Sequence, residues 1–467
     1  MLKPEKRQEL ETFIKEIQED YSIPGLSVAL AQDGEVLYAA GFGWADREAE
    51  LPAGPDTIYG FASVTKSFTA LAIMILEQEG KLSTGDPVTA YLPEFQYGAD
   101  SHGRCATIHH FLTHSAGLPP TAALRYAMVR SIEDDVSADQ LRAKDKWSEW
   151  VDRDPIDSYE ELMQFLTECD APKLGPCGAQ FSYSNDAYAL LGAIVERVSG
   201  LSFEDFVGQR ILAPLAMNRS LFDPAELPHR DNVTQLYVKN DDGETIPAPL
   251  WNAAPAMVGA GFLKSTVLDM IRYGQVYAGQ RQDILSRIGV AQMTAPYLPC
   301  GRDTYYGYGL MIHPDYHGLK VVEHGGSLKG IASYIAVIPE KGLTAAVVAN
   351  LVDVPASRIW LAALNAALDL PLAEPLTREP EYEATMEDVQ RWVGVYRSNE
   401  GTEVTITVEE GTPHIEAKGE KQPLRPSGPD TAAMIYRGAE MGISFVSDGT
   451  GAVSAVFYGY RLVPRQS

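Results

Sequence analysis

Two residues near the start of the chain have the types and the spacing of a nucleophile and its base. Ser63 and Lys66 stand three residues apart at the expected start of a helix over residues 64–79. Side chains three apart on a helix share a face, so the amine would lie beside the hydroxyl. A buried amine that has lost its proton can take one from a hydroxyl. The alternative is an exposed lysine on an amphipathic helix.

The residues that follow Lys66 favour the reactive alternative. Residues 68–76 are almost wholly apolar, as expected of a helix that is buried between two lobes. A lysine on such a helix costs free energy unless it is paired or takes part in chemistry. The start of the helix also supplies a positive potential that favours an alkoxide on Ser63.

A second segment carries groups that complete such a site. Tyr183 and Asn185 stand just before a helix expected over residues 186–213. A phenol can relay a proton, and an amide can hydrogen-bond a substrate carbonyl. Taken alone, the segment fits equally well with a core tyrosine followed by a helix cap.

A third segment is rich in glycine. His324, Gly325, Gly326 and Ser327 precede a strand expected over residues 333–338. Two glycines permit a ligand to approach the backbone closely, and the imidazole can bond a substrate or orient the phenol. Taken alone, a glycine-rich turn with an exposed histidine explains the same residues.

Together, and in this order, the three segments resemble the three signatures of the penicillin-recognising serine hydrolases. Tyr-Ser-Asn in second place is similar to the class C β-lactamase and D-aminopeptidase branch. His-Gly-Gly in third place is similar to D-amino-acid peptidases and β-lactamase-like esterases. Residues 107–119 and 306–310 agree with the resemblance, which covers roughly residues 10–365.

The resemblance implies a role for each matching residue. Ser63 would be the nucleophile, and Lys66 and Tyr183 would share the general-base and proton-relay roles. The backbone N–H groups of Ser63 and Ser327 would form the oxyanion hole. The expected substrate-binding residues are Asn185, His324, Gly325, Gly326 and Ser327.

His324 stands where many relatives have a lysine, which is a fixed cation for a substrate carboxylate. A histidine with an ordinary pKa of about 6.5 is mostly neutral at pH 7, so recognition of a terminal carboxylate should weaken. We therefore expect a serine hydrolase that acts through an acyl-enzyme on amide or ester bonds. Short peptides that contain D-residues, or small esters, are the expected substrates.

Other functions remain open. A β-lactamase or DD-carboxypeptidase would use the same residues, although a neutral His324 disfavours it. A non-enzymatic penicillin-binding-like module is disfavoured by the complete set of reactive groups, and acyl transfer to an acceptor other than water needs no further residue. His110 and His114 have an i, i+4 spacing but lack the rest of a zinc motif, so we expect no metal and no cofactor.

The order of the expected elements indicates an α+β fold. A helix over residues 4–20 and a hairpin over 26–41 open the chain, and a hairpin over 333–350 and a helix over 356–369 close its main part. These would form one antiparallel sheet flanked by helices, with a helical lobe between them. The resemblance implies the same β-lactamase/transpeptidase-like arrangement. An acidic, tryptophan-bearing insertion over 121–180 is expected to form a lid.

The composition changes after the main part. We expect a hydrolase domain over residues 1–370, a proline-rich linker over 371–385 and a small all-β barrel over 386–467. The barrel is similar to the lipocalin-like domain of some relatives. We expect it to restrict access to the cleft, as the insertion does.

The charge and composition limit the partners. With 38 Lys and Arg against 63 Asp and Glu, the net charge of −25 disfavours nucleic acids and anionic membranes. Four cysteines are too few for a disulfide framework, so thiols are expected rather than a Cys169–Cys177 bridge. The first residues lack the apolar stretch of a secretory signal, which predicts a cytoplasmic protein. The partner would be a small molecule or short peptide, and a homo-oligomer remains open.

Overall fold

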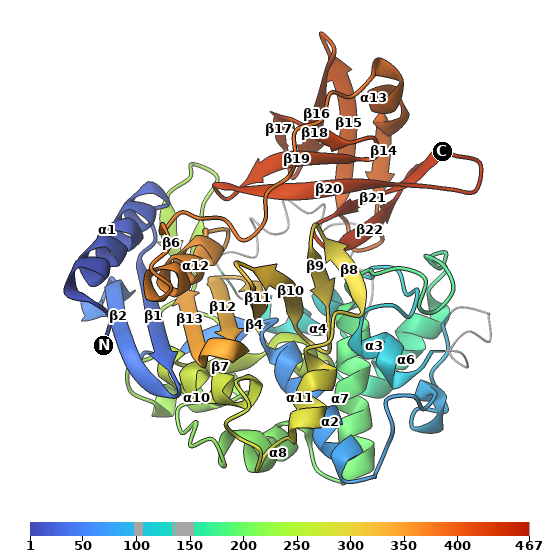
Figure 1. The fold of residues 1–467 in the computed structure, drawn as a ribbon. Coiled ribbons are helices and arrows are strands. Elements are labelled where there is room, and N and C mark those ends of the chain that lie inside the picture. Colours follow the sequence, from blue (N-terminus) through green and yellow to red (C-terminus); the bar gives the residue numbers. More distant parts are fainter. Residues whose placement is uncertain (98–105, 133–134, 136–153, 467) are drawn as a thin grey trace.

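A nine-stranded antiparallel sheet is the largest element of the fold (Figure 1). The computed structural model describes residues 1–97, 106–132, 135 and 154–466. The strand order is β3-β2-β1-β13-β12-β11-β10-β9-β8. In that order the strands span Leu51–Pro52, Glu35–Asp46, Gly25–Gln32, Leu343–Ala349, Ile331–Ile338, Leu319–Leu328, Met311–Tyr316, Thr304–Tyr306 and Leu298–Gly301.

The two strands that pair near the middle of the sheet come from opposite ends of the main part. β1 lies antiparallel to β13, with Val28 opposite Val347. Every residue of β13 is buried, because helices cover both faces of the sheet. Such double cover explains why these strands read as continuous apolar runs. The predicted pair of hairpins in one antiparallel sheet is confirmed.

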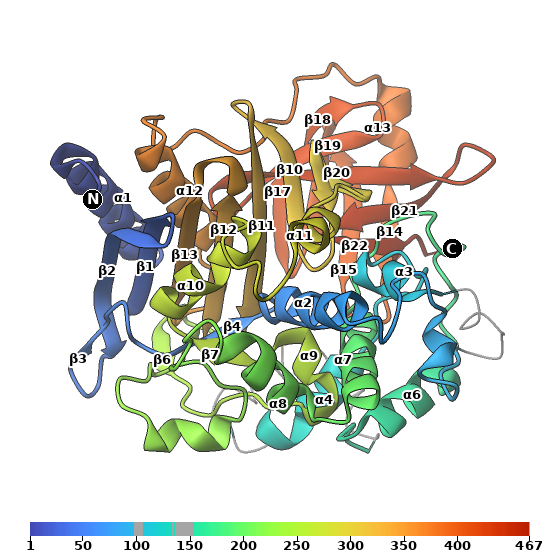
Figure 2. The ribbon, with the colours of Figure 1, turned by 60° about the horizontal axis from the view of Figure 1, so that its bottom comes forward.

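One face of the sheet carries α1 (Pro4–Asp20) and α12 (Ala356–Ala367), which also contact each other (Figure 1). The other face carries the helical lobe, with α2 (Thr65–Gln78) at its centre and α7 (Asn185–Ser199) packed on it (Figure 2). Within the part of the chain that the structure describes, two short strand pairs and seven more helices complete the main part, and their bounds follow. They are β4 Tyr59–Ala62, β7 Leu263–Ser265, β5 Tyr237–Lys239, β6 Thr245–Pro247, α3 Ile108–Leu112, α4 Ala123–Ile132, α6 Tyr159–Glu168, α8 Phe203–Val207, α9 Val258–Gly261, α10 Val267–Tyr277 and α11 Arg287–Met293.

Helices α4 and α6 lie in the stretch where we expected a helical insertion. Its two tryptophans, Trp147 and Trp150, lie outside the described residues. The role of this insertion as a lid therefore stays a prediction.

Residues 386–466, here called the C-terminal unit, form two further antiparallel sheets that share one core. The indole of Trp392 stacks on the Phe445 ring in this core, with ring centroids 4.6 Å apart. The all-β character predicted for this part is confirmed, apart from one short helix, whereas its likeness to lipocalins stays a prediction. The elements are α13 Met386–Trp392, β14 Gly394–Arg397, β15 Glu403–Glu409, β16 Thr412–Ala417, β17 Glu420–Pro423, β18 Arg425–Gly428, β19 Thr431–Tyr436, β20 Ala439–Ser447, β21 Val453–Tyr458 and β22 Arg461–Pro464.

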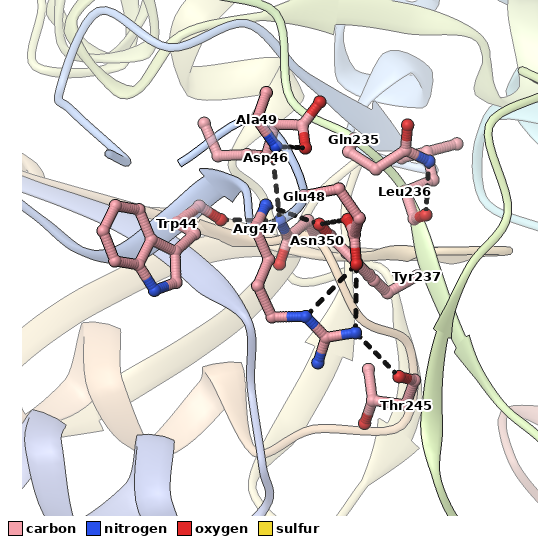
Figure 3. Close-up of polar contacts among 11 residues, drawn as sticks. Trp44, Asp46, Arg47, Glu48, Ala49, Gln235, Leu236, Tyr237, Thr245 and Asn350 are labelled. Atoms are coloured by element: carbon pink, nitrogen blue, oxygen red, sulfur yellow. Dashed lines mark hydrogen bonds and ion pairs between the residues drawn. The ribbon is translucent and has the colours of Figure 1, made fainter. Parts of the chain in front are cut away.

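A single buried amide, that of Asn350, holds the junction of β1, β2 and β13, and Figure 3 shows its contact with Trp44 on β2. The Oδ1 atom of Asn350 accepts the N–H of Gly25 at 2.8 Å, and its Nδ2 atom donates to the Trp44 carbonyl at 3.1 Å. The same Nδ2 atom reaches the Thr234 hydroxyl at 3.1 Å. All polar atoms of this side chain thus have partners, as a buried amide requires.

Three of the four cysteines lie in the described part, and Cys169, Cys177 and Cys300 carry thiols there, as expected. Among the described helices, none has both the length and the apolar character that crossing a bilayer requires.

Candidate active site

Ser63 stands in a strained turn between β4 and α2. The residue before it, Ala62, has a φ of +44°, a left-handed value that costs an L-residue about 1 kcal/mol. The Thr65 hydroxyl holds this turn from inside. It donates to the Ala62 carbonyl at 2.7 Å and accepts the N–H of Leu263 on β7 at 3.0 Å. The turn therefore presents the Ser63 hydroxyl, which is partly exposed, at the start of a buried helix.

Lys66 lies one turn further on and is fully buried. Its Nζ atom lies 3.3 Å from Ser63 Oγ, 2.8 Å from Asn185 Oδ1 and 2.5 Å from the Ala260 carbonyl. A neutral amine has two N–H groups and one lone pair. The two acceptors that cannot donate, Asn185 Oδ1 and the Ala260 carbonyl, take the two N–H groups. The lone pair is then left for the Ser63 hydroxyl, which is the arrangement of a general base.

Burial lowers the pKa of the Lys66 ammonium well below its ordinary value, because the apolar surroundings disfavour the charge. The positive charge of Arg461 lowers this pKa further, whereas Glu400 and Asp186 raise it. The amine is therefore available without its proton at a lower pH than an exposed lysine would be.

The Tyr183 phenol lies beside the nucleophile and near the amine. Its pKa is raised by burial, and a hydrogen bond with the Ser63 hydroxyl partly offsets that rise. The Nζ atom of Lys66 lies 4.8 Å from the centre of the phenol ring. A neutral phenol beside the nucleophile can pass a proton between Ser63 and a leaving group.

The glycine-rich segment forms the end of β11, beside β12. A Cβ atom added to Gly326 would lie 2.1 Å from the Phe61 carbonyl and 3.0 Å from the Ser63 nitrogen. Only glycine permits this approach of the strand to the turn that carries the nucleophile. Ser327, the next residue, is exposed. The arrangement brings this end of β11 beside the backbone N–H of Ser63, as an oxyanion hole from Ser63 and Ser327 requires.

His324 is buried, and both of its ring nitrogens have partners within the protein. Nε2 lies 3.0 Å from the Tyr306 hydroxyl, and Nδ1 lies 2.6 Å from the Gly325 carbonyl. Burial, followed by the charge of Lys66, lowers the pKa of His324 to about 3. The ring is therefore neutral at physiological pH, in line with the expectation that this position carries no fixed cation.

The C-terminal unit reaches into the site through the turn between β21 and β22. The Tyr183 N–H donates to the Tyr460 carbonyl at 2.9 Å, and the Leu462 N–H donates to the Ser182 hydroxyl at 3.3 Å. Arg461 places its guanidinium carbon 4.8 Å from the centre of the Tyr183 ring. Its Nε and Nη2 atoms bind the Glu400 carboxylate at 2.7 and 3.1 Å. In the sequence, Arg461 is an ordinary turn residue, and no spacing connects it with Tyr183.

A cavity of about 2320 Å³ lies between the sheet, the helical lobe and the C-terminal unit. Lys66 lies beneath its wall, and every other residue that the sequence assigned to the site lines it. These lining residues are Ser63, Tyr183, Asn185, His324, Gly325, Gly326 and Ser327.

Sequence reasoning missed two further buried groups at the site. Asp186, directly after Asn185, accepts the Thr121 hydroxyl at 2.7 Å, and burial raises its pKa to about 7. In the sequence it looked like an ordinary acid in the first turn of a helix. His114 was considered only with His110 as a metal pair, but the two rings diverge. His110 caps the start of α3, whereas the His114 ring packs on Tyr183 with centroids 4.3 Å apart.

Comparison with known proteins agrees with this geometry. The family model described as Beta-lactamase matches residues 10–368. The chain belongs to the Beta-lactamase family. It is a serine hydrolase of that family, as the resemblance of the three segments implied.

Similar proteins cover nearly the whole chain. It is 26% identical to Penicillin-binding protein 4* of Bacillus subtilis (strain 168) over 475 residues, which is 98% of this chain and 97% of that protein. The structure of the octameric penicillin-binding protein homologue from Pyrococcus abyssi has a TM-score of 0.71 and 32% identity, and the match covers 98% of this chain and 99% of that one. A D-stereospecific amidohydrolase from Streptomyces sp. shares the fold, with a TM-score of 0.57 and 23% identity over 74% of this chain and 93% of that one.

Gly326→Ala should disable this Beta-lactamase-family site without unfolding the chain. The new methyl group would push β11 away from the Ser63 turn, and loss of the expected Ser327 oxyanion donor would then cost about 10²–10³ in rate. The rate at which a fluorophosphonate labels Ser63 measures the effect. Gly208→Ala is the control, because nothing lies within 4 Å of the added Cβ. Equal labelling rates in the two variants would contradict the assigned backbone contact.

Asp186→Asn should change how stability depends on pH. The folded pKa of about 7 exceeds the ordinary value of 3.8, so the stability linked to this group is present below pH 4 and lost as the pH rises through 7. The loss amounts to at most about 4 kcal/mol. The melting temperature of the variant, measured relative to that of the wild type, should therefore rise between pH 4 and pH 8. Asp388→Asn is the control, because hydrogen bonds with Thr385 lower the pKa of this half-buried carboxyl and it does not titrate above pH 4. It should show no such gain, and a difference that is constant with pH argues against the assignment.

Proposed function

We propose that the protein hydrolyses amide or ester bonds through an acyl-enzyme on Ser63, in short peptides that contain D-residues or in small esters. The contact of the Lys66 amine with the Ser63 hydroxyl, inside a buried pocket, carries the proposal. The amine takes the hydroxyl proton while Oγ attacks the substrate carbonyl. The N–H groups of Ser63 and Ser327 stabilise the oxyanion.

Tyr183 completes the cycle as the proton carrier. It passes the proton from Lys66 to the leaving nitrogen or oxygen, and the carbon–heteroatom bond breaks to leave the acyl group on Ser63. A water molecule then attacks the ester, gives up its proton along the same route in reverse, and frees the Ser63 hydroxyl. We assign catalytic roles to Ser63, Lys66 and Tyr183 on this basis.

We assign the substrate-binding roles to polar groups at the site that have no hydrogen-bond partner assigned within it. Because Asn185 Oδ1 binds Lys66, its amide N–H groups can donate to a substrate carbonyl. We propose that His324, Gly325, Gly326 and Ser327 form the strand edge along which the substrate lies.

The charges in the cleft support small neutral substrates over β-lactams and D-Ala-D-Ala peptides. His324 is neutral, and Arg461 is already paired with Glu400. Neither offers an unpaired cation to a terminal carboxylate, which disfavours the β-lactamase and DD-carboxypeptidase alternative. A structural neighbour described as a D-stereospecific amidohydrolase supports the D-residue preference.

We further propose a division into a hydrolase domain over residues 1–370, a linker over 371–385 and a C-terminal domain over 386–467. The separate core of the C-terminal unit supports this division. Its turn at Tyr460 and Arg461 narrows the cleft beside Tyr183, which favours short substrates. The octameric homologue from Pyrococcus abyssi supports a homo-oligomer.

A turnover panel tests the proposal. It contains a para-nitrophenyl ester, a D-amino-acid amide, its L-isomer and nitrocefin. The ester and the D-amide should be hydrolysed at least about tenfold faster than nitrocefin, because neither the neutral His324 nor the paired Arg461 offers a cation to the β-lactam carboxylate. Nitrocefin as the fastest substrate would favour the β-lactamase alternative, and turnover of none would favour a non-enzymatic module.

Labelling identifies the nucleophile in the same assay. A fluorophosphonate should label the wild type and leave Ser63→Ala unlabelled. Ser67→Ala is the matched control, because Ser67 is a buried serine of the same helix whose hydroxyl donates to the Val64 carbonyl at 2.8 Å. Labelling of Ser63→Ala at the wild-type level would refute the assignment.

Two substitutions at the ion pair test Lys66 as the base. Arg461 lowers the pKa of Lys66 and Glu400 raises it. Because the neutral amine is the active form, Arg461→Gln should move the acid limb of kcat/KM to higher pH, and Glu400→Gln should move it to lower pH. An uncharged ester is the substrate, so that only groups of the protein titrate. If the acid limbs of the two variants shift in the same direction, or do not move, Lys66 is not the base.

A further inference from the structure

A hydrogen-bonded row of side chains connects the segment that carries Tyr183 with the glycine-rich segment. At one end, the Ser184 N–H donates to His114 Nδ1 at 3.0 Å. This nitrogen must be bare in order to accept, and burial lowers the pKa of His114 well below its ordinary value. The neutral ring therefore carries its proton on Nε2.

At the other end, His324 Nδ1 lies 2.6 Å from the Gly325 carbonyl. A carbonyl oxygen only accepts, so Nδ1 carries the proton of this neutral ring and Nε2 is bare. The two histidines thus have opposite tautomers, and a contact with the main chain favours each one.

The Tyr306 hydroxyl lies between the two rings. It is 3.2 Å from His114 Nε2 and 3.0 Å from His324 Nε2. Within the row, one set of directions satisfies all the atoms, and the Tyr188 hydroxyl, which also interacts with Tyr306, donates to the Leu112 carbonyl at 2.7 Å. His114 Nε2–H donates to the Tyr306 oxygen, and the Tyr306 O–H donates to His324 Nε2. Every donor in the row has one acceptor, so the row needs no charged member.

The backbone at His114 is strained to hold this ring. Its φ is +55°, in the left-handed region that glycine adopts without cost. The ring contacts Tyr183 with centroids 4.3 Å apart, and the His114 carbonyl accepts the Ser182 N–H at 2.9 Å. The strained turn therefore supports the phenol through both its ring and its main chain.

We propose that His114 and Tyr306 are positioning residues of the reaction: they fix the tautomer and orientation of His324 and tie the Tyr183 segment to the end of β11. The nucleophile lies between these two segments, so their separation sets the distance from the phenol to the oxyanion donors. The His324 ring lines the cleft, and its Nε2 atom already accepts a hydrogen bond from Tyr306. The expected rate effects rest on the proposed function, whereas the tautomers do not.

Tyr308, two residues after Tyr306, offers a matched control. The Tyr308 hydroxyl bonds His109 Nδ1 at 2.8 Å, and its ring stacks on Tyr297 with centroids 4.8 Å apart. Tyr308 is buried, as Tyr306 is, but its partner His109 does not line the cavity, whereas His324, the partner of Tyr306, does. Tyr308→Phe thus removes a hydroxyl–histidine bond of the same kind outside the reaction centre.

The test combines histidine tautomers with steady-state kinetics on the full chain. Long-range ¹H–¹⁵N correlations of ¹⁵N-histidine-labelled protein report which ring nitrogen carries the proton. The signals are assigned from those lost in His114→Asn and His324→Gln. We expect Nε2–H for His114 and Nδ1–H for His324 in the wild type. In Tyr306→Phe, the His324 signals should move toward a mixture of tautomers.

The kinetic readout separates positioning from general stability. In Tyr306→Phe, kcat for the para-nitrophenyl ester should fall about 10–100-fold, with KM changed less than about threefold, because misplacement by about 1 Å costs on that order. Tyr308→Phe should leave kcat and both tautomer patterns at wild-type values. His114→Asn, whose side chain tolerates a positive φ, should lower kcat in the same way and replaces Tyr306→Phe if that variant does not fold.

Two results would overturn the inference. The first is an Nε2–H tautomer for His324 in the wild type. The second is agreement between Tyr306→Phe and Tyr308→Phe in both readouts. A wild type that shows the expected tautomers but hydrolyses nothing in the panel would instead refute the proposed function and leave the assignment of the row intact.

Discussion

The burial of one amine constrains the rest of the site. Lys66 is useful as a base only if its surroundings disfavour the charged form and still leave its lone pair toward Ser63. The apolar helix α2 supplies the first condition. The Asn185 amide and the Ala260 carbonyl supply the second, because they bind the two N–H groups. Elements from three distant parts of the chain must meet around a single nitrogen, and the α+β fold brings them together.

Much of the fold was predictable because the relevant signals are local. The opening helix, both central hairpins and α2 follow from apolar periodicity and turn residues. Their observed bounds lie within one or two residues of the expected ranges, except that β2 continues five residues beyond residue 41, to Asp46. The short strands β4, β7, β8 and β9 escaped prediction. Strands of three or four residues carry too little alternation, and partners distant in sequence define them.

The residues of the site also differ in whether local sequence signals identify them. Residue type and order in the three segments predict Ser63, Lys66, Tyr183, Asn185 and residues 324–327. The fold brings these residues together around one cavity. Arg461 and Asp186 could not be found in this way. Their influence on Lys66 depends on burial and on the docking of the C-terminal unit, and neither is encoded in local spacing.

The main-chain bonds from Tyr460 to Tyr183 and from Leu462 to Ser182 make the last strands of the chain part of the reaction centre. A protein cut before these strands would keep the side chains of Ser63, Lys66 and Tyr183, yet the segment that carries Tyr183 would lose two anchors and become exposed to bulk solvent. Shortening of the chain at this end would therefore change the surroundings of Tyr183 as well as the shape of the cleft.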